Sequence, residues 1–461
     1  MASISSTKRG SVGGHGSIEP FKINISQAVL DDLQAKLKCR RLPGQPAAAS
    51  PSAPKAAGLS SKDNGVATPD IEALAKYWLK EFDWRAQEEQ LNSEVPQYKT
   101  YMSVAGEQDM GIHFLWERSQ AETAVPLLMV HGWPSSPFEF GKIIRELAHP
   151  KDAAHPSFHC VAPSLPGHVF SDLPKSAGFG IMKTAEAFHV LMQQLGYKKY
   201  FGSFVCRAMA LQYPDAVRGT HQNMVLTKTP SPSFHLVKFF KLAMSMVSGG
   251  GVLPGTYSRR EVKNLHHVQK FVLKQEMGYN QIMSTKPLTV SYGLTDSPVG
   301  LLAWIWEKLD FWTDEYPWTQ DEILRWTMLY WMGGIYGSAQ LYKNYQVERD
   351  MLTSKYCSVP IGVSLFEGDL FCLPGDFASM VQPVHFFREH ARGGHFPAYE
   401  QSRREGQQPT TYKATTSFPV AAAEGQHSQA LRSIRRSLPP VSGGNALLCE
   451  PPRRLMTPGN P

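Results

Sequence analysis

Residues 125–137 read VPLLMVHGWPSSP, a short apolar run that ends in a Gly-Trp-Pro turn. An apolar run of this length is typical of a strand that is buried on both faces of a parallel sheet. A second such run, FHCVAPSLPG, begins at residue 158, and the segment 182–195 (MKTAEAFHVLMQQL) that follows it has the period of an amphipathic helix. Strands that alternate with helices predict a doubly wound α/β domain.

A long segment of a different kind interrupts this α/β pattern. Residues 230–345 are rich in Trp, Tyr, Leu and Met and have the pattern of successive helices. Inserted into an α/β domain, they predict a lid over the carboxyl ends of the strands, where such sheets bind ligands. The expected organisation is a disordered start (1–17), an N-terminal region (18–125) with a low-complexity insertion (44–68), the first part of the α/β core (126–229), the helical lid (230–345), the second part of the core (346–400) and a disordered basic tail (401–461).

Composition and charge exclude several classes of protein. Hydrophobic residues make up 42% of the chain, as in a globular protein, and the formal net charge is +7. The tail contributes most of that charge, which argues against a nucleic-acid partner. The six cysteines form no CxxC pair and indicate reduced thiols, not a zinc site or disulfides. No apolar run reaches the roughly 18 residues of a membrane span, and the N-terminus has no secretory signal. We therefore predict a cytoplasmic protein without a membrane span or a bound metal.

Two residues near the end of the α/β pattern have the types and the order needed to activate water. His395, in RGGHF, follows a predicted strand and a Gly-Gly turn, which can bring an imidazole to a loop tip. Asp369, in LFEGDLF, directly follows an apolar strand and precedes the histidine, where an α/β-hydrolase carries the acid that orients its imidazole. The alternatives are an ordinary histidine and an aspartate that only forms a turn.

The HGWP turn at residues 131–134 also has two interpretations. It can aim a backbone N–H at a developing oxyanion, a task that requires fixed donors. Alternatively it is a tight structural turn, with a cis bond before Pro134 as one option. The turn alone does not decide between these interpretations.

Between about residues 18 and 400 the chain carries a series of motifs in order: EPFKINIS, AKYWLKEFDWRAQEEQLN, IHFLWERS, HGWP, VAPSLPG, FHVLMQQLGY, YPDAVRGTHQNM, YWMGG, LYKN and RGGHF. Together they resemble the fungal and microsomal-type epoxide hydrolases, which carry an N-terminal epoxide hydrolase domain. The resemblance implies an α/β-hydrolase fold with a helical lid insertion and an N-terminal helical and meander extension. It also implies a small hydrophobic epoxide and water as substrates, and no cofactor.

In that family an aspartate attacks an epoxide carbon to form a covalent ester, and a histidine paired with an acid then activates water to hydrolyse it. The resemblance assigns the histidine to His395, the acid to Asp369 and the oxyanion N–H to Trp133. Two lid tyrosines that donate hydrogen bonds to the departing oxygen correspond to Tyr342, in QLYKN, and Tyr279, in MGYNQIM. A phenol is protonated at pH 7 and can play this part. Either tyrosine could instead be a core residue of an aromatic lid.

The sequence departs from the family where the nucleophile belongs. The family's Gly-Gly-Asp-Trp-Gly turn is absent, because the chain passes from Tyr200-Phe201-Gly202 directly to Ser203 and Phe204. We identify no nucleophile, and we expect the shortened junction to draw the following helix across the edge of the sheet. Our hypothesis is that the sequence is an imperfect translation of a functional gene, which the change of character after Tyr399 also favours.

Three functions compete on this evidence. The first is epoxide hydrolysis, and the second is a catalytically inactive homologue that binds a hydrophobic ligand under the lid. An esterase or dehalogenase is disfavoured because it would not explain the tyrosine pair. The aromatic lid favours a hydrophobic substrate, either a xenobiotic that is detoxified or an intermediate of secondary metabolism, and a homodimer is compatible with the sequence.

Overall fold

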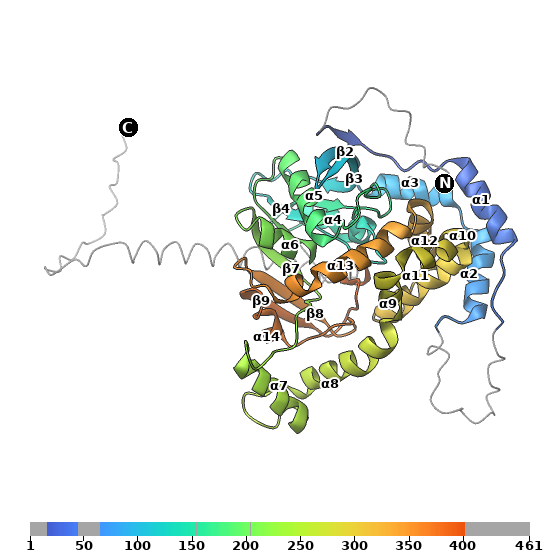
Figure 1. Ribbon diagram of the computed structural model, residues 1–461. Coiled ribbons are helices and arrows are strands. Elements are labelled where there is room, and N and C mark those ends of the chain that lie inside the picture. The colour runs from blue at the N-terminus through green and yellow to red at the C-terminus, as the bar shows by residue number, and fades with distance from the viewer. Residues whose placement is uncertain (1–15, 45–64, 153–154, 203, 402–461) are drawn as a thin grey trace, which may run out of the picture. The chain divides into compact units, whose positions relative to one another are not determined.

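The computed structural model describes residues 16–44, 65–152, 155–202 and 204–401. Its centre is a nine-stranded sheet in the order β1-β2-β3-β5-β4-β6-β7-β8-β9 (Figure 1). The pairings from β1 to β5 are antiparallel and the remaining pairings are parallel. The strands are β1 (Ile18–Pro20), β2 (Gln97–Val104), β3 (Glu107–Glu117), β4 (Val125–Leu128), β5 (Phe158–Pro163), β6 (Tyr200–Gly202), β7 (Val217–Gln222), β8 (Ile361–Phe366) and β9 (Val384–His390).

Helices cover the sheet and fill the long connection between β7 and β8. The predicted insertion at 44–68, the start at 1–17 and the tail at 401–461 lie almost wholly outside the described residues. The helices are α1 (Gln27–Lys38), α2 (Thr68–Lys80), α3 (Trp84–Glu94), η2 (Pro137–Phe140), α4 (Gly141–Ala148), α5 (Ile181–Gln194), α6 (Phe204–Gln212), α7 (Leu236–Ser248), α8 (Arg259–His267), η3 (Val268–Glu276), α9 (Gly278–Thr285), α10 (Pro287–Asp296), α11 (Pro298–Trp312), α12 (Gln320–Gly333), α13 (Tyr336–Ser354), α14 (Gly375–Ala378) and α15 (Pro397–Glu400).

The strand that opens the quoted stretch is buried on both faces, as its apolar run predicted. Successive side chains of a strand point to opposite faces of the sheet. Leu127 and Met129 belong to a core cluster with α1–α4 and α12, whereas Leu128 and Val130 belong to a second cluster with α5 and α6. The predicted α/β fold, with helices on both faces of a largely parallel sheet, is confirmed.

Our expectation that the shortened β6–α6 junction would displace the helix is wrong. Strand β6 lies between β4 and β7, and α6 packs against α5 and β7 with Val205 and Met209 fully buried. The chain instead passes from strand to helix across one residue, which brings the backbone of Gly202 very close to its surroundings. A Cβ at this position would overlap Sγ of Cys206 and lie 3.1 Å from the carbonyl oxygen of Leu128. The tight turn therefore requires glycine.

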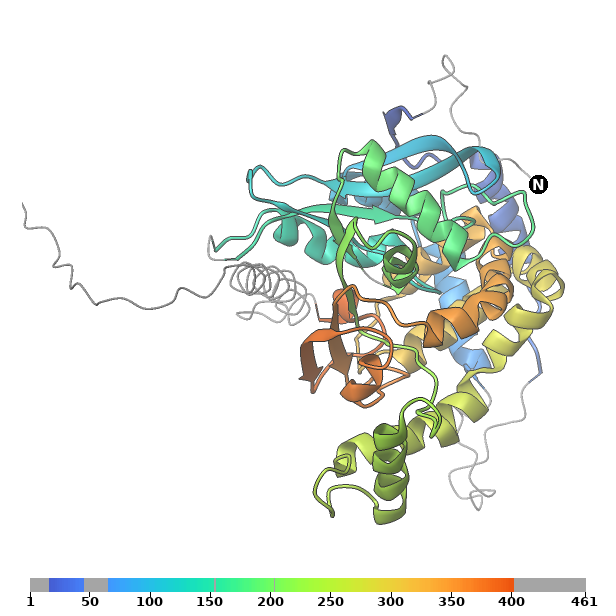
Figure 2. The same cartoon turned by 60° about the vertical axis from the view of Figure 1, so that its left-hand side comes forward.

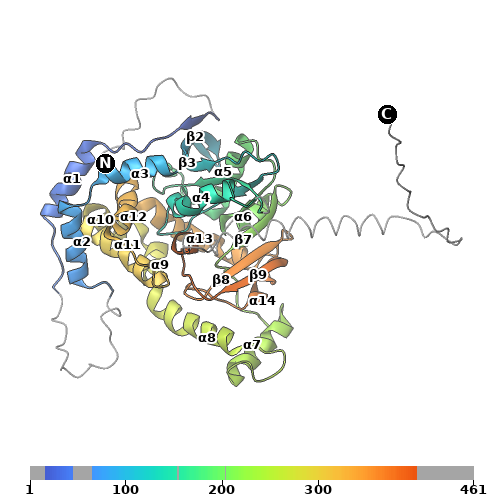
Figure 3. The same ribbon diagram turned by 180° about the vertical axis from the view of Figure 1, so that it is seen from behind.

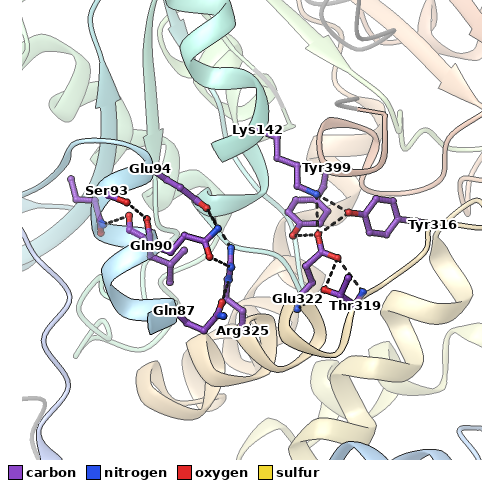
Figure 4. Close-up of polar contacts among 12 residues, drawn as sticks. Gln87, Gln90, Ser93, Glu94, Lys142, Tyr316, Thr319, Glu322, Arg325 and Tyr399 are labelled. Carbon is purple, nitrogen blue, oxygen red and sulfur yellow. Dashed lines mark hydrogen bonds and ion pairs between the residues drawn. The ribbon is translucent and has the colours of Figure 1, made fainter. Parts of the chain in front are cut away.

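The helices between β7 and β8 form the lid, and its last helix, α13, continues to Ser354, past residue 345. The N-terminal helices α1 and α2 pack against α11 and α12 of this lid, as the view from behind shows (Figure 3). A polar cluster adds to the contact: Arg325 of α12 donates hydrogen bonds to Gln87 (2.7 Å) and Gln90 (2.6 Å) of α3 (Figure 4). The N-terminal extension thus holds the lid from outside the sheet.

Candidate active site

The loops that follow β8 and β9 bring Asp369 and His395 together. Nδ1 of His395 lies 2.7 Å from Oδ1 of Asp369. The same carboxylate accepts hydrogen bonds from the backbone N–H of Leu370 (2.7 Å) and from the side-chain amide of Asn223 (3.1 Å). Asn223 also donates to the carbonyl oxygen of His395 (3.2 Å). Because the acid is held at both oxygens, it fixes the ring orientation of the imidazole and leaves Nε2 for a reacting group.

A second carboxylate holds the backbone around His395. Oε2 of Glu400 accepts hydrogen bonds from the N–H groups of Gly394 (2.9 Å) and Asp314 (2.8 Å), and Oε1 accepts from the N–H of Phe396 (2.9 Å). The two residues next to the histidine in sequence are therefore tied to one buried side chain. Because both oxygens of Glu400 accept hydrogen bonds from this backbone, the side chain positions the loop that carries the imidazole.

The acids around His395 make its imidazole more basic than that of an ordinary histidine. Burial is the largest influence and lowers the pKa of His395, but the charge and hydrogen bond of Asp369, together with the charges of Glu139 and Glu400, outweigh it and raise the pKa above 6.5. Burial also raises the pKa of Glu139 to about 7 and that of Glu400 to about 7, against opposing hydrogen bonds and, for Glu139, the charge of His395. The histidine therefore lies among acids that titrate near neutral pH.

The loop of His395 is also linked to the lid. In α15, Tyr399 donates a hydrogen bond to Glu322 of α12 (2.8 Å), which Lys142 and Tyr316 also contact (Figure 4). Burial would raise the pKa of Glu322, but the charge of Lys142, the N–H of Thr319 and the two tyrosine hydroxyls lower it to about 2. This ionised carboxylate connects the core, the lid and the end of the histidine loop.

The two predicted tyrosines lie next to each other in the lid. The rings of Tyr279 in α9 and Tyr342 in α13 lie 5.7 Å apart and nearly perpendicular, and Trp133 stacks on Tyr279 at 5.0 Å. Trp312 contacts both Tyr279 (5.2 Å) and His395 (5.3 Å), so aromatic rings connect the tyrosines with the dyad. Burial raises the pKa of Tyr279 to about 12 and that of Tyr342 well above 10. Both phenols are therefore protonated donors at neutral pH.

These residues surround one cavity of about 820 Å³. Its wall includes Trp133, Tyr279, Tyr342 and His395, with Asp369 behind the histidine, so the structure brings all five predicted site residues together. The peptide bond between Trp133 and Pro134 is cis. Because most of the wall is apolar, the cavity suits a small hydrophobic ligand.

The β6–α6 junction forms part of the same wall, through Gly202 and Val205. Among the residues that the structure describes between Tyr200 and Gln212, none is an acid, in agreement with the missing nucleophile. Of the described residues that line the cavity, Glu139 is the sole carboxylate. No group of three or more His, Cys, Asp or Glu in the described ranges could hold a metal ion.

Three residues of the site escaped the sequence analysis: Glu139, Glu400 and Asn223. A signal existed for two of them. Glu139 is a lone acid in the apolar run that follows HGWP, and an acid among apolar residues is usually buried for a reason. Glu400 is the acid that follows His395 most closely in the sequence, at the end of HFPAYE. Asn223 has no local signal, because its two partners are more than 140 positions away in the chain.

Comparison with known proteins agrees with this geometry. The family described as "Epoxide hydrolase N terminus" matches residues 18–140, and the family described as "alpha/beta hydrolase fold" matches residues 125–244. Epoxide hydrolase 1 of Sus scrofa is 32% identical over 416 residues, which covers 84% of this chain and 86% of the pig protein.

Two solved structures are similar over most of the chain. The epoxide hydrolase of Aspergillus niger has a TM-score of 0.70 at 29% identity and covers 87% of this chain and 97% of its own. The juvenile hormone epoxide hydrolase of the silkworm Bombyx mori has a TM-score of 0.75 at 29% identity and covers 90% of this chain and 96% of its own. None of the helices in the described part of the chain is long and apolar enough to cross a membrane.

Proposed function

Because this chain belongs to the epoxide hydrolase family of α/β-hydrolases, we propose that its cavity holds a hydrophobic epoxide between the phenols of Tyr279 and Tyr342 and the imidazole of His395. Addition of water to the epoxide gives a vicinal diol. The observation that supports these residue roles is the single cavity on which both phenols and the Asp369–His395 dyad converge. The relatives do not favour the alternative of an inactive homologue.

The chemistry assigns a task to each group. The two phenols donate hydrogen bonds to the epoxide oxygen as its bond to carbon breaks, which stabilises the developing alkoxide. The attacking carboxylate forms an ester with the carbon, and His395, oriented by Asp369, removes a proton from the water that hydrolyses the ester. The backbone N–H of Trp133 stabilises the oxyanion formed in that second step.

The attacking carboxylate is the missing part. We propose that the functional enzyme carries it in an elbow between β6 and α6. The printed sequence would then lack this elbow because the gene was imperfectly translated into protein sequence, as misread exon boundaries would cause. The cavity reaches Gly202 and Val205, so an elbow inserted there would face the two phenols and the histidine. Glu139 cannot simply replace it, because its carboxylate is buried beside the dyad and partly protonated at pH 7.

The apolar wall favours a hydrophobic substrate, either a xenobiotic that is detoxified or an intermediate of secondary metabolism. We further propose that the protein is cytoplasmic and that it forms a homodimer, and static light scattering would test the oligomeric state.

Two proteins test the proposed chemistry: the chain of the printed sequence, and a variant with Gly-Gly-Asp-Trp-Gly inserted after Gly202. Diol formation from an aromatic epoxide should be absent in the first and present in the second, and His395→Gln in the second protein should abolish turnover. Diol formation by the printed chain would show that no elbow is needed, and inactivity of the restored protein would overturn the residue roles. Mass spectrometry of the native protein decides the sequence question, since a peptide reading KKYFGSFVCR rejects the translation error.

A further inference from the structure

Helix α7 exposes an apolar face that has no partner in the described part of the chain. The positions of its exposed large side chains (236, 237, 240, 244 and 247) fall on one side of a helix with 3.6 residues per turn. More than half of the large apolar side chains that are exposed in the described ranges lie between residues 234 and 273. Contiguous exposed apolar surface of this kind marks an interaction site. The residues of this face, called here the α7 face, are Leu236, Val237, Phe240, Met244 and Val247.

The opposite face of α7 fixes this orientation. Lys241 forms an ion pair with Asp376 of α14 (3.0 Å), and Lys238 donates to the carbonyl oxygen of the same residue (2.9 Å). Tyr257 donates to the Asp376 carboxylate (2.9 Å) and belongs to a small apolar cluster with which Leu242 of α7 packs. The helix thus turns its lysines toward the protein and its apolar residues toward solvent, which is the reverse of a water-soluble surface helix.

The neighbouring helices supply positive charge. Residues 231–280 contain seven Lys or Arg and two Glu, a net charge of +5 within a chain whose total is +7. Four of these basic residues are exposed or nearly so on α8 and η3 and pair with no carboxylate in the described ranges: Arg259, Lys263, Lys270 and Lys274. An apolar helix beside unpaired basic residues has the two features that bind a helix to an anionic lipid surface.

The cavity opens toward the same region. Leu242 of α7 and Leu265 of α8 line it, as do Gln269 and Leu273 of η3, which are also exposed. In Figure 1 and in the turned view of Figure 2, α7 and α8 lie together and apart from the sheet. A surface that docks on the α7 face therefore lies next to an opening of the cavity.

We propose that the α7 face inserts into the surface of an anionic lipid bilayer, with the basic residues of α8 and η3 against the lipid head groups. A second copy of this chain fits less well, because a symmetric contact would bring two of these basic helices close together. The segment 401–461 fits less well for the same reason, since it carries eight Lys or Arg and three Glu. An anionic bilayer satisfies both the apolar and the charged part of the surface.

This inference extends the proposed function to a substrate class, and in that respect it rests on that function. A hydrophobic epoxide dissolved in a membrane would enter the cavity beside Leu273 without crossing bulk water. Attachment through the α7 face needs no membrane-spanning helix, because an interfacial helix lies in the plane of the head groups.

Vesicle flotation tests the attachment without any turnover, so its outcome is independent of the catalytic proposal. The full chain should float with vesicles of phosphatidylcholine and phosphatidylserine, and less with phosphatidylcholine alone. Val247→Asp should reduce binding to the anionic vesicles about tenfold, since it places a charge in the part of the face that inserts into the bilayer. The matched control is Val347→Asp in α13, because Val347 is 87% exposed and Val247 is 91% exposed. The control variant should bind like the wild type.

The charge contribution is tested separately. Lys263→Gln and Lys270→Gln should each reduce binding to anionic vesicles by about fivefold at low salt and leave binding to phosphatidylcholine unchanged. Absence of wild-type binding, or equal binding by Val247→Asp, would overturn the proposal. A lipid-free dimer that Val247→Asp converts into a monomer, without vesicle binding, would assign the face to a second copy instead.

Discussion

Asp369→Asn removes the charge that faces the imidazole of His395 and nearly preserves the shape of the side chain. The amide oxygen can still accept the hydrogen bonds that reach Oδ1, from the imidazole and from the N–H of Leu370. The amide nitrogen then meets the side-chain nitrogen of Asn223, so one hydrogen bond is lost. The substitution therefore tests mainly the electrostatic effect of the acid on the histidine.

The structure sets the size of this effect. Two unit charges about 4 Å apart interact with ~4 kcal/mol at an effective dielectric constant of about 20. Burial is the largest influence on His395 and lowers its pKa, and only the acids around it bring the pKa above 6.5. Without the charge of Asp369, burial should prevail, and the pKa of His395 should fall below 6.5.

The sign of the stability effect follows. In the wild type the raised pKa of His395 stabilises the fold below pH 6.5, and this contribution disappears as the pH rises through the folded-state pKa. In the variant the lowered pKa costs stability once the pH falls below 6.5. The melting temperatures of the two proteins should therefore differ more at pH 5 than at pH 8.

NMR titration of ¹³C-labelled histidines measures the pKa directly, with His395 assigned from a His395→Gln sample. Asp172→Asn is the control, because its carboxylate pairs with Lys99 (2.8 Å) and not with the histidine. Equal His395 titrations in the wild type and in Asp369→Asn would refute the reasoning, because the acid would then not control the charge of the imidazole.

Three further predictions concern the lid contact, the β6–α6 junction and the phenols. Lys142→Met removes one of the groups that together lower the pKa of Glu322 to about 2, the others being hydrogen bonds. The ionised carboxylate stabilises the fold above pH 4.5 and loses this effect toward pH 2. The variant should therefore lose roughly 1.5–3 kcal/mol of stability at pH 7, measured by urea unfolding. Gly202→Ala should cost ~1–3 kcal/mol in the same assay, because a Cβ there overlaps its surroundings, whereas Gly293→Ala, with open space around it in α10, should stabilise by ~0.4–1 kcal/mol. Tyr342→Phe in the elbow-restored protein should lower kcat for diol formation by about tenfold to hundredfold, because one donor to the departing oxygen is lost; an unchanged kcat would exclude its role.

The parts of the fold that the sequence predicted are those in which local pattern and tertiary contact agree. The run at residues 125–130 is apolar at every position, which predicts a strand that is buried on both faces. In the structure its side chains alternate between two core clusters, one on each face of the sheet. The helix predicted at 182–195 lies at Ile181–Gln194 for the same reason, since its apolar stripe packs on the sheet. Asp369 and His395 were found because each follows a strand, and the ends of neighbouring parallel strands meet at one edge of the sheet.

The error at the β6–α6 junction has a physical cause. The expected displacement of α6 requires that the missing turn alone determines how the helix is placed relative to β6. The short strand β6 instead keeps its place through pairing with β4 and β7, and the burial of Val205 and Met209 holds α6 against α5. The shortened connection makes the turn at Gly202 tight, and glycine tolerates the close approach of Cys206 there.

The residues that escaped prediction act on the dyad through the backbone. Glu400 accepts hydrogen bonds from the backbone N–H groups on both sides of His395. A substitution of Glu400 would therefore change the position of the imidazole, although the two side chains form no hydrogen bond with each other. Such contacts cannot be predicted from the residue type, because a buried glutamate and an exposed one are the same letter in a sequence. The electrostatics of the site follow from the same geometry. Burial alone would lower the pKa of His395, and the three acids around it, Asp369, Glu139 and Glu400, raise it. In the proposed mechanism, an imidazole of raised pKa accepts a proton from water more readily, so these acids would support His395 in the hydrolysis of the ester.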